Sequence, residues 1–198
     1  MSAFTWPPEG ADSSAAARAP ATAPIAAAVL VPLFRADGGR QLHIVLTRRR
    51  ADLRRHAGEI AFPGGRKDFE DASLEQTALR EAEEEIGLTR EQVSVIGELR
   101  PTSTFATNYV IHPFVASVPE GVAWRVSAKE VDAVLELPLD DVRESRTTTT
   151  LERRGITFQT GAFVLDGNVI WGATARIIED LLAWLSEDTA RAAALGVG

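Results

Sequence analysis

The segment from Glu59 to Leu88 constrains this chain more than any other, because it prescribes an extended run, a glycine turn and a capped helix in succession. Pro63 gives a rigid turn, and Gly64 and Gly65 after it have no side chains, so backbone groups there can approach a ligand closely. A helix is then predicted from an N-cap at Ser73, a capping-box partner at Gln76 and a C′ glycine at Gly87. Its apolar positions recur at helical spacing: Leu74, Ala78, Leu79, Ala82 and Ile86.

The same helix carries a run of carboxylates towards its C-terminal end, namely Glu81, Glu83, Glu84 and Glu85. Glu81, Glu84 and Glu85 share one face, where like charges cost about 0.2–0.5 kcal/mol per pair. Such a cluster suits a hard divalent cation such as Mg²⁺ or Mn²⁺. The alternative is a solvated acidic helix face, which we prefer for Glu83 alone because it points in a different direction. The sequence therefore predicts a metal-bound diphosphate site.

The residues from Gly64 to Leu88 resemble the Nudix box, G-x5-E-x7-R-E-U-x-E-E-x-G-U, in which U is aliphatic. The second half matches closely: Arg80, Glu81, Ala82, Glu84, Glu85, Gly87 and Leu88 fall in place. The first half departs, because Asp71 replaces the first glutamate, and eight residues rather than seven separate it from Arg80. This resemblance implies diphosphate hydrolysis by an α/β protein, an α/β/α sandwich around a mixed sheet.

A second resemblance, to the coenzyme A diphosphatase branch of that family, lies upstream and again near Ile170–Ile177. The pattern L-L-T-x-R-[SA]-x3-R-x3-G-x3-F-P-G-G matches at Arg49, Arg54 and Gly58, and departs at Val45 and Arg50. The resemblance implies coenzyme A as substrate, with Arg49, Arg54 and Gly65 in its binding.

In this interpretation Glu81, Glu84 and Glu85, together with the Gly64 carbonyl, hold the cations, and Arg80 supports the glutamates and the glycine loop. Arg80, Glu81 and Glu84 are the expected catalytic residues. The general base stays open between Glu81 and a later carboxylate such as Glu130, because sequence cannot show which lies within reach of the attacking water.

The charge of the chain limits the kinds of molecule that it is expected to bind. A net charge of −7 argues against a nucleic-acid surface, yet Arg48, Arg49, Arg50, Arg54, Arg55 and His56 cluster within nine residues. This cluster is either a solvated basic loop or a site for a small, highly charged anion such as coenzyme A. His43 and His112 are expected to be structural.

The chain contains no cysteine, which is compatible with a reducing cytoplasm, and no apolar run of membrane-spanning length or secretory signal is apparent. Residues 1–22 are expected to form a flexible tail and residues 23–198 one domain. Monomer and homodimer both stay open.

The remaining predicted elements are strands at 25–34, 41–48, 93–99 and 110–118, a short helix or turn at 129–135, hairpins at 147–160 and 163–171, and a helix near 174–186. Two alternative functions are weighed. The first keeps the chemistry but acts on ADP-ribose, NADH or an oxidised nucleoside triphosphate. The second is a non-catalytic nucleotide-sensing module, which the intact glutamates disfavour.

Overall fold

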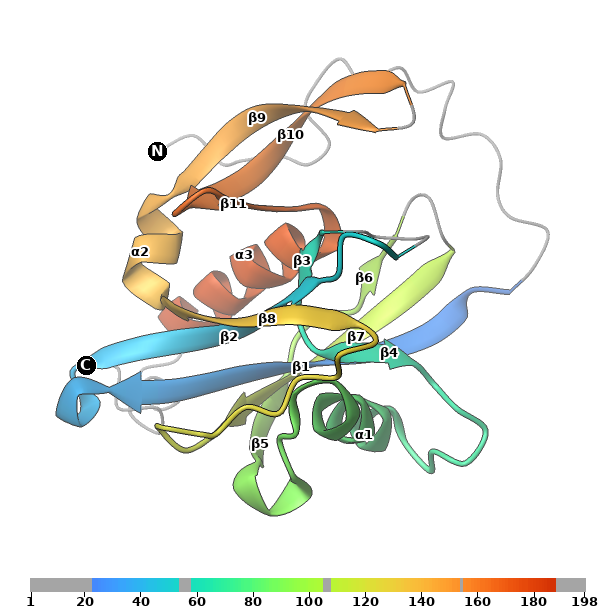
Figure 1. The fold of residues 1–198 in the computed structure, drawn as a ribbon, viewed down its shortest axis with the longest axis vertical. Helices are drawn as coiled ribbons and strands as arrows, with labels where there is room; N and C mark the ends of the chain where they lie inside the picture. The colour runs from blue at the N-terminus through green and yellow to red at the C-terminus, as the bar shows by residue number, and fades with distance from the viewer. Residues whose placement is uncertain (1–22, 54–57, 105–107, 154, 188–198) are drawn as a thin grey trace.

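Two β-sheets and three α-helices make up the computed structural model, which describes residues 23–53, 58–104, 108–153 and 155–187 (Figure 1). The larger sheet contains β1 (Ile25–Ala36), β2 (Gln41–Arg49), β3 (Ile60–Ala61), β4 (Gly64–Arg66), β5 (Ser94–Glu98), β6 (Thr102–Ser103), β7 (Tyr109–Ser117) and β8 (Val131–Pro138). The smaller sheet contains β9 (Arg146–Arg153), β10 (Ile156–Leu165) and β11 (Asn168–Trp171). The helices are α1 (Leu74–Ile86), α2 (Leu139–Glu144) and α3 (Gly172–Glu187), with 3₁₀ turns η2 (Asp37–Gly39) and η3 (Arg90–Gln92).

The larger sheet is mixed. Its central strand β1 runs parallel to β7, and β1 is antiparallel to β2 and β4. Strand β2 pairs with β3 and β8, and β7 pairs with β5 and β6, all antiparallel. The pairing of β4 with β1 sets Gly65 opposite Ala28, so the glycine turn is fixed at the middle of the fold.

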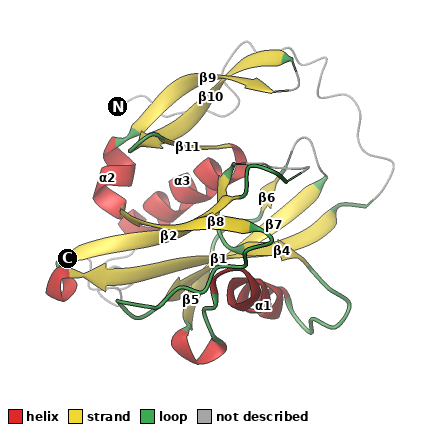
Figure 2. Cartoon of the chain, viewed as in Figure 1, coloured by secondary structure: helices red, strands yellow, loops and turns green. Residues whose placement is uncertain are grey.

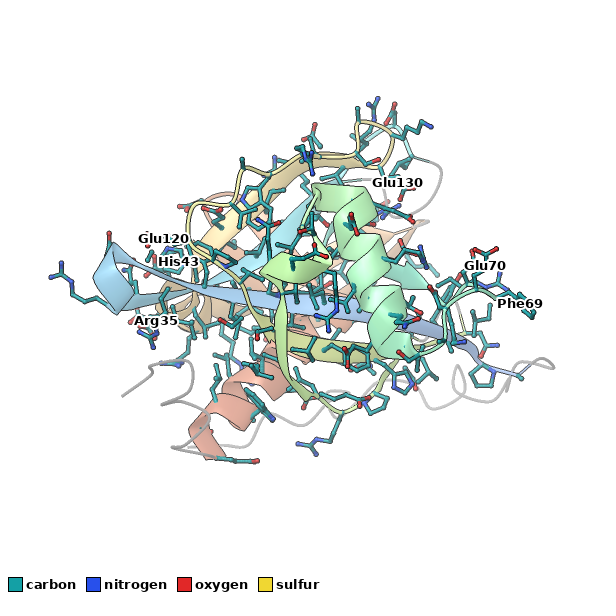
Figure 3. The ribbon with its side chains drawn as sticks, turned by 90° about the horizontal axis from the view of Figure 1, so that it is seen from below. Arg35, His43, Phe69, Glu70, Glu120 and Glu130 are labelled. Atoms are coloured by element: carbon teal, nitrogen blue, oxygen red, sulfur yellow. The ribbon has the colours of Figure 1, made fainter. Side chains whose placement is uncertain are left out.

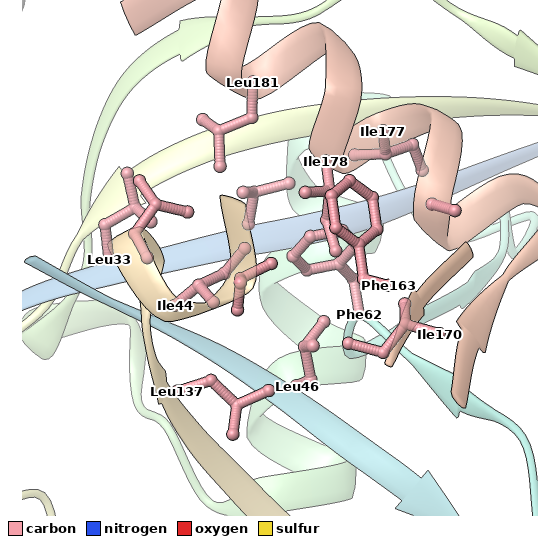
Figure 4. Close-up of a cluster of buried hydrophobic side chains, with 14 of the residues drawn as sticks. Leu33, Ile44, Leu46, Phe62, Leu137, Phe163, Ile170, Ile177, Ile178 and Leu181 are labelled. Atoms are coloured by element: carbon pink, nitrogen blue, oxygen red, sulfur yellow. The ribbon is translucent and has the colours of Figure 1, made fainter. Parts of the chain in front are cut away.

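The two faces of the larger sheet are covered by different helices, as the red helices in Figure 2 show. Along β1 the side chains alternate, with Val31 and Leu33 packing on the α3 side and Leu30 on the α1 side. The core beneath α3 includes Ile44, Leu46, Ile178 and Leu181 (Figure 4). The predicted α/β/α sandwich with a mixed sheet is therefore confirmed.

Three elements differ from the sequence expectations. Residues 129–135 were expected to form a short helix or turn, but β8 begins at Val131, because this segment pairs with β2 and places Leu135 opposite Leu46. Ile156–Thr160 and Phe163–Leu165, expected in separate hairpins, form the single strand β10. Helix α2 was not predicted, because its six residues are too few for a clear periodic signal.

Within the described residues, no helix is both long and apolar enough to cross a membrane. The predicted tail at residues 1–22 lies outside the described part of the chain.

Candidate active site

Helix α1 presents the acidic run, and its two ends are fixed largely as the sequence predicts. The Ser73 side chain accepts a hydrogen bond from the Gln76 amide at 3.1 Å, and Gly87 adopts a left-handed conformation with φ 71°. The reciprocal half of the capping box differs, because the Gln76 side chain accepts from the Ala72 amide rather than from the cap residue. This hydrogen bond fixes Ala72, the residue before the N-cap, against the first turn of the helix.

Asp71 anchors Arg80. Arg80 donates from Nε and Nη2 to the two carboxylate oxygens of Asp71, each at 3.0 Å, in a bidentate arrangement. Asp71 is buried and also accepts from the Thr77 hydroxyl at 2.9 Å and from the Asp68 amide at 2.9 Å. These donors, Arg80 foremost, hold the pKa of Asp71 well below its ordinary value. The shorter residue at the first box position therefore makes a full set of contacts despite the altered spacing.

The fixed guanidinium of Arg80 then contacts the acidic run and the glycine turn. Its Nη1 lies 3.0 Å from Glu81 Oε1 and 3.3 Å from Glu84 Oε2, and its Nη2 donates to the Arg66 carbonyl at 3.4 Å. Arg80 therefore contacts both the glutamates of α1 and the strand that contains the glycine turn.

The three predicted ligand carboxylates have different environments. Burial raises the pKa of Glu81, partly offset by Arg80, whereas the Glu84 side chain is 61% exposed. Glu85 is only 4% exposed, and this burial raises its pKa to about 8, partly offset by Arg49. A carboxylate whose pKa is raised by burial beside other charged groups is a common mark of a functional site.

The glycine turn approaches two of these carboxylates. The Gly64 amide donates to Glu85 Oε2 at 3.4 Å. A Cβ atom on Gly65 would overlap the Glu81 carboxylate, and one on Gly64 would lie 2.6 Å from the Val29 Cα. Both positions therefore require glycine for close approach of the backbone.

A fourth carboxylate, Glu130, reaches the same place from the segment that precedes β8, and Figure 3 shows it beside α1. Its charge contributes to the raised pKa values of both Glu81 and Glu85. The guanidinium of Arg49, at the end of β2, lies between two of the carboxylates, 3.5 Å from Glu85 and 3.6 Å from Glu130.

The segment that carries Glu130 is attached to the end of α1 by its backbone. Ser127 N–H donates to the Glu85 carbonyl at 2.8 Å and Arg125 N–H to the Ile86 carbonyl at 3.0 Å. From the other side, the Arg50 guanidinium donates to the Ala128 carbonyl at 2.6 Å. The sequence does not reveal these contacts, since each of them has a backbone carbonyl as its acceptor, which any residue provides.

The donor set fits a hard cation chemically. It consists of carboxylate oxygens, two of them on side chains whose raised pKa values an added positive charge would lower. As the side chains stand, no three His, Cys, Asp or Glu residues in the described ranges form a group that could hold a metal ion. Arg80 and Arg49 lie against the carboxylate oxygens instead.

The other predicted residues have these positions. Arg54 and His56 lie outside the described residues. His43 stacks on Phe34 with ring centroids 5.0 Å apart, and His112 Nδ1 lies 3.2 Å from Glu98, in keeping with the structural roles expected for both.

Comparisons with known proteins identify the family of the chain. A family model described as NUDIX domain matches residues 24–158. The uncharacterized Nudix hydrolase NudL of Salmonella paratyphi B is 40% identical over 157 residues, which cover 78% of this chain and 80% of that protein.

Two solved structures share the fold. The NUDIX domain of Shewanella oneidensis NrtR, crystallised with ADP ribose, aligns with a TM-score of 0.55 at 18% identity over 88% of this chain and 99% of that one. A mutT/nudix family protein from Listeria innocua aligns with a TM-score of 0.57 at 19% identity, over 86% and 99% respectively. With the family model and the NudL identity, these findings show that the chain belongs to the Nudix family and is a Nudix hydrolase.

Proposed function

We propose that this Nudix hydrolase cleaves the diphosphate bond of coenzyme A or its derivatives, giving 4′-phosphopantetheine and adenosine 3′,5′-bisphosphate. The observation that carries the proposal is the position of Arg49. This residue belongs to the pattern that resembles the coenzyme A diphosphatase branch, and its guanidinium lies 3.5 Å from Glu85 in the acidic cluster. An arginine beside the diphosphate-cleaving residues can pair with substrate phosphate oxygens.

Glu81, Glu84 and Glu85, with the Gly64 carbonyl, would hold Mg²⁺ or Mn²⁺, which when bound would neutralise diphosphate charge and acidify a water molecule. Arg80 keeps Glu81 and Glu84 in place through its bidentate contact with Asp71. Gly65 lets the Glu81 carboxylate lie directly against the backbone of the turn, where a Cβ atom would overlap it. Arg54 is assigned to substrate binding from the sequence pattern alone.

Two carboxylates compete for the role of general base. Glu81 is half-buried and lies against the glycine turn, whereas the Glu130 side chain is 52% exposed and accessible to water. Glutamine substitution at each position, followed by the pH dependence of kcat, distinguishes them: loss of the base removes the acidic limb of the profile.

A substrate panel tests the proposal. With Mn²⁺ present, coenzyme A should be among the substrates with the highest kcat/KM when compared with ADP-ribose, NADH and an oxidised nucleoside triphosphate. A clear preference for one of these others would refute the assignment of coenzyme A but leave the diphosphatase chemistry intact.

Arg50 is the specific observation in favour of such a different substrate, because the branch pattern has Ser or Ala there. In this chain the Arg50 guanidinium contacts Asp52 at 2.7 Å and the Ala128 carbonyl at 2.6 Å. Its hydrogen bonds are thus directed within the protein, which supports retaining coenzyme A as the first choice.

A further inference from the structure

Two arginines share the four carboxylates of the candidate site, and each guanidinium faces two of them. Arg80 lies against Glu81 and Glu84, at 3.0 and 3.3 Å. Arg49 lies against Glu85 and Glu130, at 3.5 and 3.6 Å. The two arginines therefore offset part of the negative charge of the cluster in the protein alone.

The anchoring of the two guanidinium groups differs. Arg80 makes a bidentate contact with Asp71, which is itself buried and fixed by Thr77 and Asp68, and it also donates to the Arg66 carbonyl. Movement of Arg80 would break its hydrogen bonds with Asp71 and with the Arg66 carbonyl, and leave the buried Asp71 carboxylate without its cationic partner.

Arg49 has no comparable anchor. Within the described ranges, its guanidinium has only Glu85 and Glu130 as side-chain partners, and both distances exceed those of a well-formed hydrogen bond. The side chain is 25% exposed, so solvent borders it. Arg49 can therefore leave the exposed Glu130 at little cost, and it can leave the buried Glu85 when another cation takes its place.

Both oxygens of Glu85 already face a donor. Oε1 faces Arg49, and Oε2 accepts from the Gly64 amide at 3.4 Å. The amide is held where it is by the pairing of β4 with β1, in which Gly64 lies opposite Val29. Each of these oxygens keeps a second lone pair for a cation, but a divalent cation bound there repels the Arg49 guanidinium, and Arg49 is the donor that is free to move.

We infer that Arg49 acts as an exchangeable counter-ion, which occupies Glu85 and Glu130 in the metal-free protein and gives them up to a divalent cation. The released guanidinium then becomes available to a substrate phosphate. This inference rests on the proposed function, since it takes Glu85 as a cation ligand. It places Arg49 in competition with the metal before substrate arrives and in cooperation with the metal afterwards.

The direct test is Mn²⁺ titration of the full chain by calorimetry without any substrate. Arg49→Ala should bind Mn²⁺ about fivefold to tenfold more tightly than wild type, because the competing cation has been removed. Arg49→Lys keeps a positive charge but concentrates it on one ammonium group, so its affinity for Mn²⁺ should lie between those of wild type and Arg49→Ala. Arg143→Ala is the matched control, since it also removes one positive charge, and among the described residues Arg143 pairs with exposed Asp140 on α2 at 3.0 Å.

Unchanged or weaker Mn²⁺ binding by Arg49→Ala, relative to Arg143→Ala, would overturn the inference. A melting curve of each variant establishes that it is folded, and Arg49→Lys carries the test if the alanine variant is not. Arg49→Ala should also raise the KM for coenzyme A at saturating Mn²⁺. If Arg49 only competed with the metal and did not bind substrate, this KM would not change. Failure of the proposed function would look different: wild type would bind no Mn²⁺ or would not hydrolyse coenzyme A.

Discussion

Replacement of Glu85 by glutamine should make the metal-free protein more stable, although it removes a predicted cation ligand. Glu85 is almost fully buried, and its pKa is raised to about 8 by that burial. Because the folded-state pKa lies above the ordinary value of 4.5, the wild-type protein loses stability relative to the variant as pH rises from about 4.5 to about 8. At pH 7 the loss amounts to about 3 kcal/mol, and at pH 5 to about 1 kcal/mol.

Thermal unfolding in the presence of a chelator measures this effect. At about 2–4 °C per kcal/mol for a chain of this size, Glu85→Gln should raise Tm by about 6–12 °C at pH 7 and much less at pH 5. Glutamine keeps an acceptor for the Gly64 amide, and Arg49 keeps Glu130 as a partner. Glu83→Gln, an exposed carboxylate on the same helix, is the matched control and should leave Tm nearly unchanged.

Adding Mn²⁺ should reverse the order, because ligand binding to the folded state stabilises the wild-type protein and the variant lacks one ligand carboxylate. Turnover of the variant should fall sharply. If Glu85→Gln is less stable than wild type at pH 8 without metal, the reasoning from desolvation is wrong.

The remaining predictions concern neighbouring residues. Glu84→Gln should lower kcat by orders of magnitude while Tm changes little, since this side chain is 61% exposed; unchanged turnover would remove its proposed role in metal binding. Asp71→Asn should destabilise the fold by about 3–5 kcal/mol in chemical denaturation, because Arg80 loses its buried bidentate partner. The wild-type protein should also lose stability as pH falls below about 4, since the pKa of Asp71 is lowered in the folded state, and this acid loss should be smaller in the asparagine variant. Gly65→Ala should reduce kcat more than Gly58→Ala, because only at Gly65 would the added methyl overlap a carboxylate, that of Glu81; equal losses would contradict the close-approach argument.

Sequence patterns predicted those elements that are determined by residues close together in the chain. The limits of α1 follow from Ser73 and Gly87, which act on the helix within one turn. The identity of β8 could not be predicted in this way, because apolar residues at 131, 134 and 135 also fit helical spacing and only pairing with β2 decides the matter.

In the candidate site too, some residues could be predicted from local spacing and others could not. Glu81, Glu84 and Glu85 share a helical face that spacing alone reveals. The approach of Arg49 to Glu130 depends on the pairing of β2 with the strand that follows Glu130, across about eighty residues of chain, and no short-range pattern contains it.

The attachment of residues 125–127 to the last turn of α1 has a consequence for how such a site can evolve. Since amide groups make the connection, the side chains of this stretch are free to change while the Glu85 and Ile86 carbonyls remain bonded. Mutations there can change the surroundings of Glu130 without displacing the acidic helix. The acidic helix and the residues around Glu130 can therefore change independently of each other during evolution.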